Sequence, residues 1–397
     1  MDITIFPAKL TGSLQIIPSK SQAHRLLICA AFADKPTELL CPDTNEDISA
    51  TADCLNALGA VIIRTDNGYQ IQPVRQIPEK ATLNCRESGS TLRFLLPIAG
   101  ALGVEATFQM AGRLPDRPLS PLKEEMERMG CFITRPSQNT LLCTGKLQPG
   151  SYSIAGNVSS QFITGLMFAL ALLDEPSSLN ILGKTESRPY IEMTRKALFS
   201  FGANIEGNAI YPSLPLKTPG KITVEGDWSN GAFFLAANAL GNEIDIQGLR
   251  DDSPQGDRAC KDILMEKKPI NISASDIPDL IPILSIAAAA SYGGKFSDIE
   301  RLRLKESDRV ASTVAMLRAL GIRAEADEHT LTVFPGKFCG CVINSENDHR
   351  IAMSAAIAAT IADGPVTILD AECVSKSYPN FWEIYRSLGG NYEQHLR

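Results

Sequence analysis

Apolar and polar positions along the chain form a pattern that recurs several times. A helical segment ends on a glycine, and a β-rich stretch split by a turn follows it. The pattern occurs at Leu58-Gly59, Met129-Gly130, Phe201-Gly202, Leu320-Gly321 and Leu388-Gly389. Most of the intervals are about 70 residues long, and one is about 120 residues long. Because glycine readily adopts the left-handed backbone conformation, it commonly ends a helix. The recurrence therefore predicts a chain built from repeated α/β units.

A second recurrence runs in phase with the first. Six strongly apolar segments each open on polar residues of the kind that cap helices. These openings are Ser19-Lys20-Ser21, Ser88-Gly89-Ser90, Ser159-Ser160-Gln161, Trp228-Ser229-Asn230, Asp276-Ile277-Pro278-Asp279 and Asn347-Asp348-His349. Apolar residues occupy nearly every position that follows, as in 162–170, which indicates helices that are buried on all sides. The short interval after the fourth opening predicts a shortened fourth unit.

Six such helices, each with two further elements, predict an α/β fold of two domains with three repeated units each. The polar stretch Glu225-Gly226-Asp227 is the expected join. This places the N-terminal domain at 19–225 and the C-terminal domain at 226–397 together with 1–18. Within the first unit, 60–64 and 69–71 are expected to be strands joined by the turn Asp66-Asn67-Gly68.

Composition narrows the function classes. Apolar residues make up 44% of the 397 positions and charged residues 21%, which is typical of a globular protein. The net charge of −7 disfavours a general nucleic-acid binder. The apolar stretch 162–173 is too short to cross a membrane, and the first residues do not resemble a secretory signal. We therefore expect a cytoplasmic protein that binds neither membrane nor nucleic acid. Its ten scattered cysteines, such as Cys29 and Cys54 in apolar helical stretches, are expected to be reduced thiols, with no metal site among them.

Basic residues gather near the predicted helix starts. A helix N-terminus offers unpaired N–H groups and a partial positive charge, so it can bind an anion. The basic residues at or near these starts and in nearby loops are Lys20, Arg25, Arg93, Arg117, Lys305, Arg309, Arg350 and Lys376. Any one of these helix starts could be an ordinary cap, and any one charge an ordinary surface ion pair. Their joint occurrence in an acidic protein favours a small polyanionic ligand.

Nine short motifs resemble those of the 5-enolpyruvylshikimate-3-phosphate synthase (3-phosphoshikimate 1-carboxyvinyltransferase) family, in family order over almost the whole chain. The motifs are Pro18-Ser19-Lys20-Ser21 with Arg25, Ser88-Gly89 with Arg93, Asp116-Arg117-Pro118, Val158-Ser159-Ser160-Gln161-Phe162, Ser187-Arg188-Pro189-Tyr190, Ile277-Pro278-Asp279, Arg303-Leu304-Lys305-Glu306-Ser307-Asp308-Arg309, Asn347-Asp348-His349-Arg350 and Lys376-Ser377-Tyr378-Pro379. Each motif alone is weak, but nine in register are specific.

The resemblance implies two inside-out α/β barrels, with buried parallel helices, sheets on the outside and an active site in the cleft between the domains. It also implies a reaction of aromatic amino acid biosynthesis on the route to chorismate. The enolpyruvyl group of phosphoenolpyruvate is transferred to the 5-hydroxyl of shikimate 3-phosphate through a tetrahedral ketal, and phosphate leaves. This chemistry needs proton transfer and cations rather than a metal or another cofactor. A monomer is expected.

The resemblance also implies roles for individual residues. Asp279 is the expected base for the 5-hydroxyl, Glu306 the expected proton shuttle at the methylene carbon, and Lys20 a further catalytic residue. The residues expected to bind shikimate 3-phosphate are Lys20, Ser21, Arg25, Ser159, Ser160, Gln161, Ser187, Asp279 and Lys305. Those expected to bind phosphoenolpyruvate are Lys20, Gly89, Arg117, Gln161, Arg309, Arg350 and Lys376. Asp279 could instead cap a helix after Pro278, and Glu306 could instead form a surface ion pair.

The second motif departs from the family pattern. Glu87 stands where the family usually has Asn, and Ser90 stands where it usually has Thr. An acidic side chain beside an anion site is unfavourable unless it is paired, and Arg86 is a possible partner. These departures bear on phosphoenolpyruvate affinity and on sensitivity to glyphosate.

Two alternatives stay open. A transferase that moves enolpyruvyl to UDP-N-acetylglucosamine would have Asn after the first lysine and usually Cys in its mobile loop. This chain has Ser21 after Lys20, and 112–118 contains no Cys. A non-catalytic repeat protein that binds anions would need only its packing faces, and would tolerate loss of Asp279 and Glu306.

Overall fold

The computed structural model describes residues 1–395 and divides the chain into two compact units. Unit 1 consists of Met1–Ile17 and the chain from Glu225 onward, and unit 2 of Pro18–Val224. Each unit has its own hydrophobic core.

Unit 2 contains seven helical segments and twelve strands. Its helices are α1 (Lys20–Ala31), α2 (Glu46–Ala57), α3 (Gly89–Leu102), the 3-10 helix η1 (Leu114–Asp116), α4 (Leu122–Arg128), α5 (Ser160–Ala171) and α6 (Arg188–Ser200). Its strands are β3 (Thr37–Leu40), β4 (Val61–Thr65), β5 (Gly68–Gln72), β6 (Lys80–Asn84), β7 (Glu105–Gln109), β8 (Cys131–Ser137), β9 (Thr140–Gly145), β10 (Ser151–Ala155), β11 (Ser177–Leu182), β12 (Ile205–Glu206), β13 (Ala209–Ile210) and β14 (Lys221–Thr223).

Unit 1 begins with the N-terminal strands and continues after the crossover from unit 2. Its strands within 1–395 are β1 (Asp2–Phe6), β2 (Thr11–Gln15), β15 (Glu243–Gln247), β16 (Ile270–Ser273), β17 (Gly294–Ser297), β18 (Ala324–Ala326), β19 (Thr330–Val333), β20 (Cys341–Asn344), β21 (Val366–Leu369) and β22 (Asn391–His395). Its helices are α7 (Trp228–Ala239), α8 (Ala259–Met265), α9 (Ile281–Ala290), α10 (Arg309–Ala319), α11 (His349–Ala358) and α12 (Phe381–Ser387), with 3-10 helices η2 (Gly256–Arg258), η3 (Pro278–Leu280), η4 (Glu300–Leu304), η5 (Ala359–Ile361) and η6 (Ala371–Lys376).

The sheets repeat one plan. The sheets β6-β7-β9-β8, β10-β11-β13-β12 and β16-β17-β19-β18 each join one parallel pair of strands to antiparallel neighbours. In the sheet β14-β3-β5-β4, β14 supplies the parallel edge strand beside β3. The fourth repeat has only the parallel pair β15-β2, which confirms the prediction of a shortened unit.

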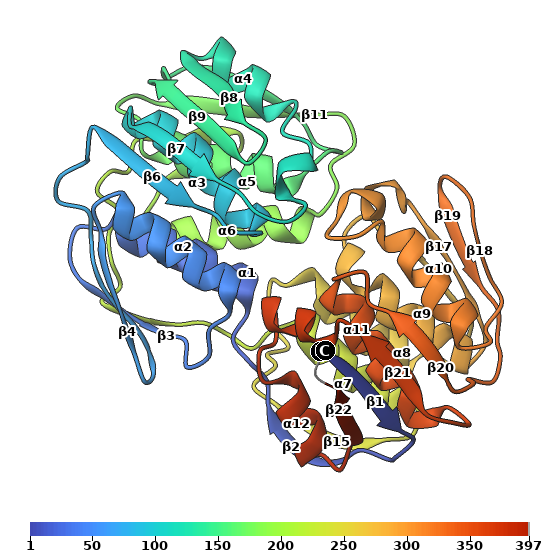
Figure 1. The fold of residues 1–397 in the computed structure, drawn as a ribbon. Helices are drawn as coiled ribbons and strands as arrows, with labels where there is room; N and C mark the ends of the chain where they lie inside the picture. Colours follow the sequence, from blue (N-terminus) through green and yellow to red (C-terminus); the bar gives the residue numbers. More distant parts are fainter. Residues whose placement is uncertain (396–397) are drawn as a thin grey trace. The chain divides into compact units, whose positions relative to one another are not determined.

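The N-terminal segment completes the sixth sheet. Strand β1 lies between β21 and β22 and is antiparallel to both, with Ile3 opposite Ile368 and Ile5 opposite Tyr392. Figure 1 shows this dark blue strand beside β21 and β22, which come from the other end of the chain. The β1 strand therefore takes the place that a hairpin strand fills in the other four-stranded sheets.

The six predicted apolar helices are present as α1, α3, α5, α7, α9 and α11. Nearly all of their residues are buried, as the lack of a polar face predicts. In unit 2, α3 packs on α5, and α1 packs on α2 and α6. The sheet β6-β7-β9-β8 packs on α3 through β7 and β9, as Figure 1 shows. The five glycines that follow α2, α4, α6, α10 and α12 all have positive φ angles, which confirms the predicted helix ends.

The length of the helices and the state of the cysteines bear on two further expectations. No helix within 1–395 is both long enough and apolar enough to span a bilayer. The ten cysteines are free thiols, and eight of them are buried, including Cys29 and Cys54.

Candidate active site

Three helix starts in unit 2 carry residues that the sequence singles out. Lys20, Gly89 and Ser160 are the first residues of α1, α3 and α5. The side chains of the preceding Ser88 and Ser159 accept hydrogen bonds from backbone N–H groups of the first turn of α3 and α5. These hydrogen bonds fix the start of each helix, where N–H groups and the helix dipole favour an anion.

Arg25 ties three helices of unit 2 together. Its Nε donates to Thr194 Oγ1 at 2.9 Å, and its Nη2 donates to the carbonyl of Tyr190 at 2.9 Å. Its Nη1 donates to the carbonyl of Ser21 at 2.5 Å, and Thr164 on α5 lies 3.4 Å from Nη2. Burial lowers the pKa of Arg25 to about 10, so the guanidinium stays charged near neutral pH. The charge lies at the start of α1, beside the first turn of α6.

The starts of α3 and α5 are joined by side-chain hydrogen bonds. Arg93 Nη1 donates to Gln161 Oε1 at 2.7 Å, and Gln161 Nε2 donates to Ser90 Oγ at 3.0 Å. Ser90, one of the two departures from the family pattern in the sequence, therefore provides the acceptor oxygen of this contact. Arg117 follows η1 and approaches Gly89 closely, because a Cβ added at Gly89 would lie 2.7 Å from Arg117 Nη1.

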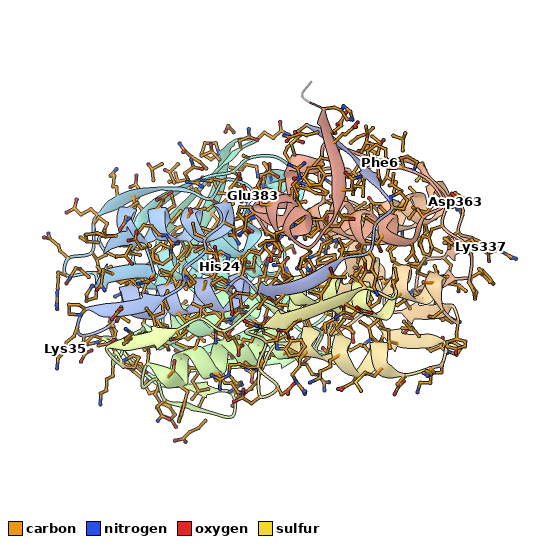
Figure 2. The ribbon with its side chains drawn as sticks, turned by 90° about the horizontal axis from the view of Figure 1, so that it is seen from below. Phe6, His24, Lys35, Lys337, Asp363 and Glu383 are labelled. Carbon is orange, nitrogen blue, oxygen red and sulfur yellow. The ribbon has the colours of Figure 1, made fainter. Side chains whose placement is uncertain are left out.

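A buried chain of hydroxyl groups links α1 to the start of α3. His24 Nδ1 lies 2.7 Å from Thr51 Oγ1, Thr51 lies 2.7 Å from Thr91 Oγ1, and Thr91 donates to Ser88 Oγ at 2.8 Å. Burial lowers the pKa of His24 to about 3, so the ring is neutral. Figure 2 labels His24 within unit 2, whereas Lys35 lies at the outer edge of the same unit. These hydrogen bonds join α1, α2 and α3 to one another, and none of the groups that form them is charged.

Other predicted residues of unit 2 lie near these helix starts. Lys20 Nζ pairs with Asp47 Oδ2 at 3.0 Å. Ser187 precedes the first residue of α6 and has a left-handed backbone conformation with φ of 54°. Arg86, the partner that the sequence suggests for Glu87, donates to Asp53 Oδ2 at 2.7 Å, so its charge is already shared with another carboxylate.

The predicted catalytic carboxylates lie in unit 1, around one buried arginine. The guanidinium of Arg309 donates to Asp279 Oδ1 at 2.7 Å and to Glu306 Oε2 at 2.5 Å. Asp279 also lies 3.5 Å from Lys305 Nζ and 3.7 Å from an Nη2 of Arg350. Arg309 is 1% exposed, whereas Asp279 is 22% exposed and Glu306 31%. The cluster thus has buried cations and carboxylates that partly reach solvent.

Asp279 lies in the first turn of η3, directly after Pro278. Its carboxylate contacts the basic side chains of Arg309 and Lys305, which a helix cap alone does not require. Glu306 forms an ion pair, but its partner Arg309 is buried rather than at the surface.

Asp348 is fully buried and pairs with Arg309, the central arginine of this cluster. Its carboxylate accepts from Arg309 Nε at 2.9 Å and Nη2 at 3.2 Å, and from Ser307 Oγ at 3.0 Å. It also caps α11 by accepting from the backbone N–H of Arg350 at 2.9 Å. A single carboxylate therefore sets the loop before α10 and the start of α11 relative to each other.

The electrostatics follow from burial and pairing. Burial alone would lower the pKa of Arg309, but Asp348, Glu306 and Asp279 outweigh it and raise the pKa. Burial also acts to lower the pKa of Arg350. Asp279 acts in the opposite direction, and the pKa of Arg350 is raised overall. Burial lowers the pKa of Lys305, which Asp279 partly opposes. Two permanently charged guanidinium groups therefore accompany an ammonium group that is easier to deprotonate.

The structure thus gathers the predicted residues into two groups, one in each unit. Lys376 also belongs to the group in unit 1, because its Nζ donates to the carbonyl of Asn347, one residue before Asp348. The sequence places Asp348 among the polar residues that open the sixth apolar helix, and its cap of α11 confirms this. Its hydrogen bonds to Arg309 and its contact partners across the chain were not predicted, and Asp47 was not singled out. Within 1–395, no group of three or more His, Cys, Asp or Glu side chains is placed to hold a metal ion.

The two groups are suited to anions and to proton transfer. Buried guanidinium groups and helix N-termini can bind phosphate and carboxylate groups. Carboxylates such as Asp279 and Glu306, held among cations at the edge of the protein interior, can accept and return protons.

Comparison with known proteins assigns the chain to a family. Residues 6–385 match the family model of EPSP synthase (3-phosphoshikimate 1-carboxyvinyltransferase). The chain is 37% identical to the 3-phosphoshikimate 1-carboxyvinyltransferase of Clostridium beijerinckii, with 99% of this chain and 98% of that protein covered. It is 38% identical to the enzyme of that name from Clostridium kluyveri, with the same coverage.

Solved structures share the fold. An EPSP synthase from Acinetobacter baumannii superposes with a TM-score of 0.80 at 24% identity, over 99% of this chain and 100% of that one. The enolpyruvyl transferase NikO from Streptomyces tendae gives a TM-score of 0.76 at 18% identity, over 99% of this chain and 98% of that one. These likenesses confirm the predicted α/β fold of repeated units. The family-model and sequence matches show that the chain belongs to the EPSP synthase (3-phosphoshikimate 1-carboxyvinyltransferase) family.

Proposed function

We propose that this chain transfers the enolpyruvyl group of phosphoenolpyruvate to the 5-hydroxyl of shikimate 3-phosphate and releases phosphate. The family match over residues 6–385 supports the reaction. The residue assignment rests on one observation. Asp279 and Glu306 both accept hydrogen bonds from the buried Arg309, and Arg350 lies beside Asp279. An anion-binding repeat protein would need the cations but not the carboxylates.

Asp279 is the proposed base for the 5-hydroxyl. The surrounding Arg309, Lys305 and Arg350 place positive charge around this carboxylate, whose oxygens are the proposed proton acceptors. Its partial exposure leaves it within reach of a substrate hydroxyl. As the hydroxyl oxygen attacks the enol carbon, its proton passes to the carboxylate, and the nearby cations stabilise the negative charge on the substrates.

Glu306 is the proposed proton shuttle at the methylene carbon. The CH2 end of the enol must gain a proton when the ketal forms and lose one when phosphate leaves. A single carboxyl group can do both, since the second step returns the proton taken up in the first. Its hydrogen bond to Arg309 restrains the side chain while leaving about a third of it exposed.

The proposed binding roles do not follow the division into two groups, because each substrate is assigned residues of both. We assign Ser21, Arg25, Ser159, Ser160, Ser187 and Lys305 to shikimate 3-phosphate, and Gly89, Arg117, Arg309, Arg350 and Lys376 to phosphoenolpyruvate. Lys20 and Gln161 are assigned to both substrates. Both groups supply charge-assisted donors, the strongest kind for phosphate and carboxylate oxygens. We further propose that the protein works as a cytoplasmic monomer without a cofactor.

The decisive experiment measures phosphate release when both substrates are mixed with the purified chain. Release is expected only with both substrates present. Asp279→Ala should lower kcat by orders of magnitude while binding of shikimate 3-phosphate stays detectable by calorimetry. A matched control, Asp251→Ala, removes an exposed carboxylate that forms a surface ion pair with Lys261, and should retain full turnover. Absence of release from the wild-type chain at any pH would favour the anion-binding alternative.

A further inference from the structure

Asp257 is a buried carboxylate in unit 1 that the reaction scheme above does not use. It lies in η2 and is 3% exposed. One carboxylate oxygen, Oδ2, accepts a hydrogen bond from the hydroxyl of Ser229, at the start of α7. The other, Oδ1, has no hydrogen-bond partner within 1–395. A buried carboxylate with one unsatisfied oxygen is costly, which calls for a functional explanation.

Ser229 connects this carboxylate to Arg350. Arg350 Nη1 donates to the backbone carbonyl of Ser229 at 3.1 Å, and Nη2 donates to the Ser229 hydroxyl oxygen at 2.9 Å. The guanidinium also lies over the ring of Phe233, 5.8 Å from its centre. Since Arg350 can only donate, the Ser229 oxygen must accept from it, and the hydroxyl hydrogen is directed to Asp257. The orientation of the Ser229 hydroxyl is therefore set by the carboxylate.

This arrangement leaves Arg350 with donors for a ligand. Each Nη atom of arginine carries two hydrogens. Ser229 takes one hydrogen from each, and the contact with Asp279 at 3.7 Å is too long for a hydrogen bond. The Nε–H also has no partner within 1–395, and it lies parallel to the remaining N–H of Nη2. These two donors form the paired geometry that a carboxylate or phosphate accepts.

We propose that Asp257 is a positioning residue for phosphoenolpyruvate: by accepting the Ser229 hydroxyl proton, it turns the Ser229 lone pairs to Arg350 and holds the guanidinium ready for the anion. The inference rests on the proposed function, in which Arg350 binds phosphoenolpyruvate. Asp257 itself does not touch the substrate.

The charges around Asp257 make this role sensitive to pH. Burial, with help from Asp279 and Asp227, raises its pKa to about 7, and Arg350 opposes the shift. Cys260 on α8 is a further titratable neighbour, a buried thiol whose pKa is raised by burial and by Asp257, so it stays neutral. Above about pH 7 the ionised Asp257 accepts from Ser229. Below that pH the protonated carboxyl can donate to the same Ser229 oxygen and compete with Arg350.

The test compares Ser229→Ala, Asp257→Ala and the double variant in steady-state kinetics with both substrates. Each single variant is expected to raise the KM for phosphoenolpyruvate about tenfold, the loss typical of one hydrogen bond to a charged group. The KM for shikimate 3-phosphate and kcat should change less than about threefold. The double variant should resemble the single variants, because both act through the same hydrogen bond to Arg350.

Asp257→Asn separates charge from shape. Its amide oxygen can still accept from Ser229, so the KM for phosphoenolpyruvate should rise less than in Asp257→Ala. In the wild-type chain this KM should decrease as pH rises through about 7, and the Asn variant should lack that change. Glu125→Gln is the control for loss of a buried carboxylate, because Glu125 pairs with Arg128 and belongs to unit 2, whereas Asp257, Ser229 and Arg350 belong to unit 1.

The outcomes distinguish this inference from the proposed function. If the wild-type chain is active but Ser229→Ala and Asp257→Asn leave the KM for phosphoenolpyruvate unchanged, the positioning role is refuted and the reaction stands. Equal increases in both KM values would show a general structural role and would also refute it. If the wild-type chain releases no phosphate, both proposals fail. Because Ser229→Ala and Asp257→Asn are near-isosteric, they keep the test valid even where Asp257→Ala does not fold.

Discussion

Removal of the Asp348 carboxylate should strongly destabilise unit 1. Asp348 is fully buried and accepts four hydrogen bonds: two from Arg309, one from Ser307 and one from the first turn of α11. In Asp348→Ala, the buried Arg309 keeps only Asp279 and Glu306 as anionic partners. The variant therefore leaves the Nε–H donor of a buried guanidinium without its acceptor.

The magnitude follows from the contacts that are lost. Breaking a buried ion pair by removing one partner typically costs about 3–5 kcal/mol. Loss of a helix cap adds about 1 kcal/mol. The remaining bonds of Arg309 to Asp279 and Glu306 reduce the first figure, so we expect a loss of about 3 kcal/mol in the free energy of unfolding of unit 1. With a urea dependence of about 1–3 kcal/mol per M, the unfolding midpoint should decrease by about 1–3 M.

Tryptophan fluorescence offers a selective assay, because both tryptophans of the chain, Trp228 and Trp382, are buried in unit 1. Urea unfolding of the variant and the wild-type chain should be followed at this signal. Asp252→Ala serves as the control, since its partner Arg250 and Asp252 itself are both more than 60% exposed. Exposed pairs contribute at most about 1 kcal/mol. A midpoint for Asp348→Ala that matches that of the control would refute the reasoning about this buried carboxylate.

Three further outcomes are expected. Gly89→Ala should raise the KM for phosphoenolpyruvate, because the new Cβ would lie 2.7 Å from Arg117 Nη1; normal steady-state kinetics would count against this placement of Arg117. Gly68→Ala should lower the Tm of unit 2, because its φ is +150° and the new Cβ would lie 1.9 Å from the Leu39 carbonyl oxygen; an unchanged calorimetric Tm would contradict the turn geometry. Burial raises the pKa of Asp257 from its ordinary 3.8 to about 7, so its contribution to stability is present at low pH and is lost as pH rises across this range. The stability of Asp257→Asn relative to the wild-type chain should therefore increase by up to about 4 kcal/mol across it, and a pH-independent difference in urea unfolding would exclude the raised pKa.

The repeated elements of the fold were predictable from sequence because their signals are local. Helix starts such as Ser88 before α3 and helix ends such as Gly59 after α2 depend on backbone geometry within a few residues. Strand pairing across the chain was not predictable in this way. The parallel contact of β2 with β15 and the insertion of β1 between β21 and β22 join segments separated by more than 200 residues. Local periodicity does not specify which distant strand is the partner.

The candidate site was likewise predictable only where its signals are local. Sequence by itself determined the apolar helices, their polar starts and the basic residues beside them, since these follow from residue types at fixed spacing. Resemblance to a family added roles for Asp279 and Glu306. Only the tertiary structure showed that both carboxylates bind one buried Arg309, that Asp348 holds it, and that Asp257 reaches Arg350 through Ser229. These contacts join side chains from separate helices, and their energies depend on distance and burial, which no run of neighbouring residues encodes.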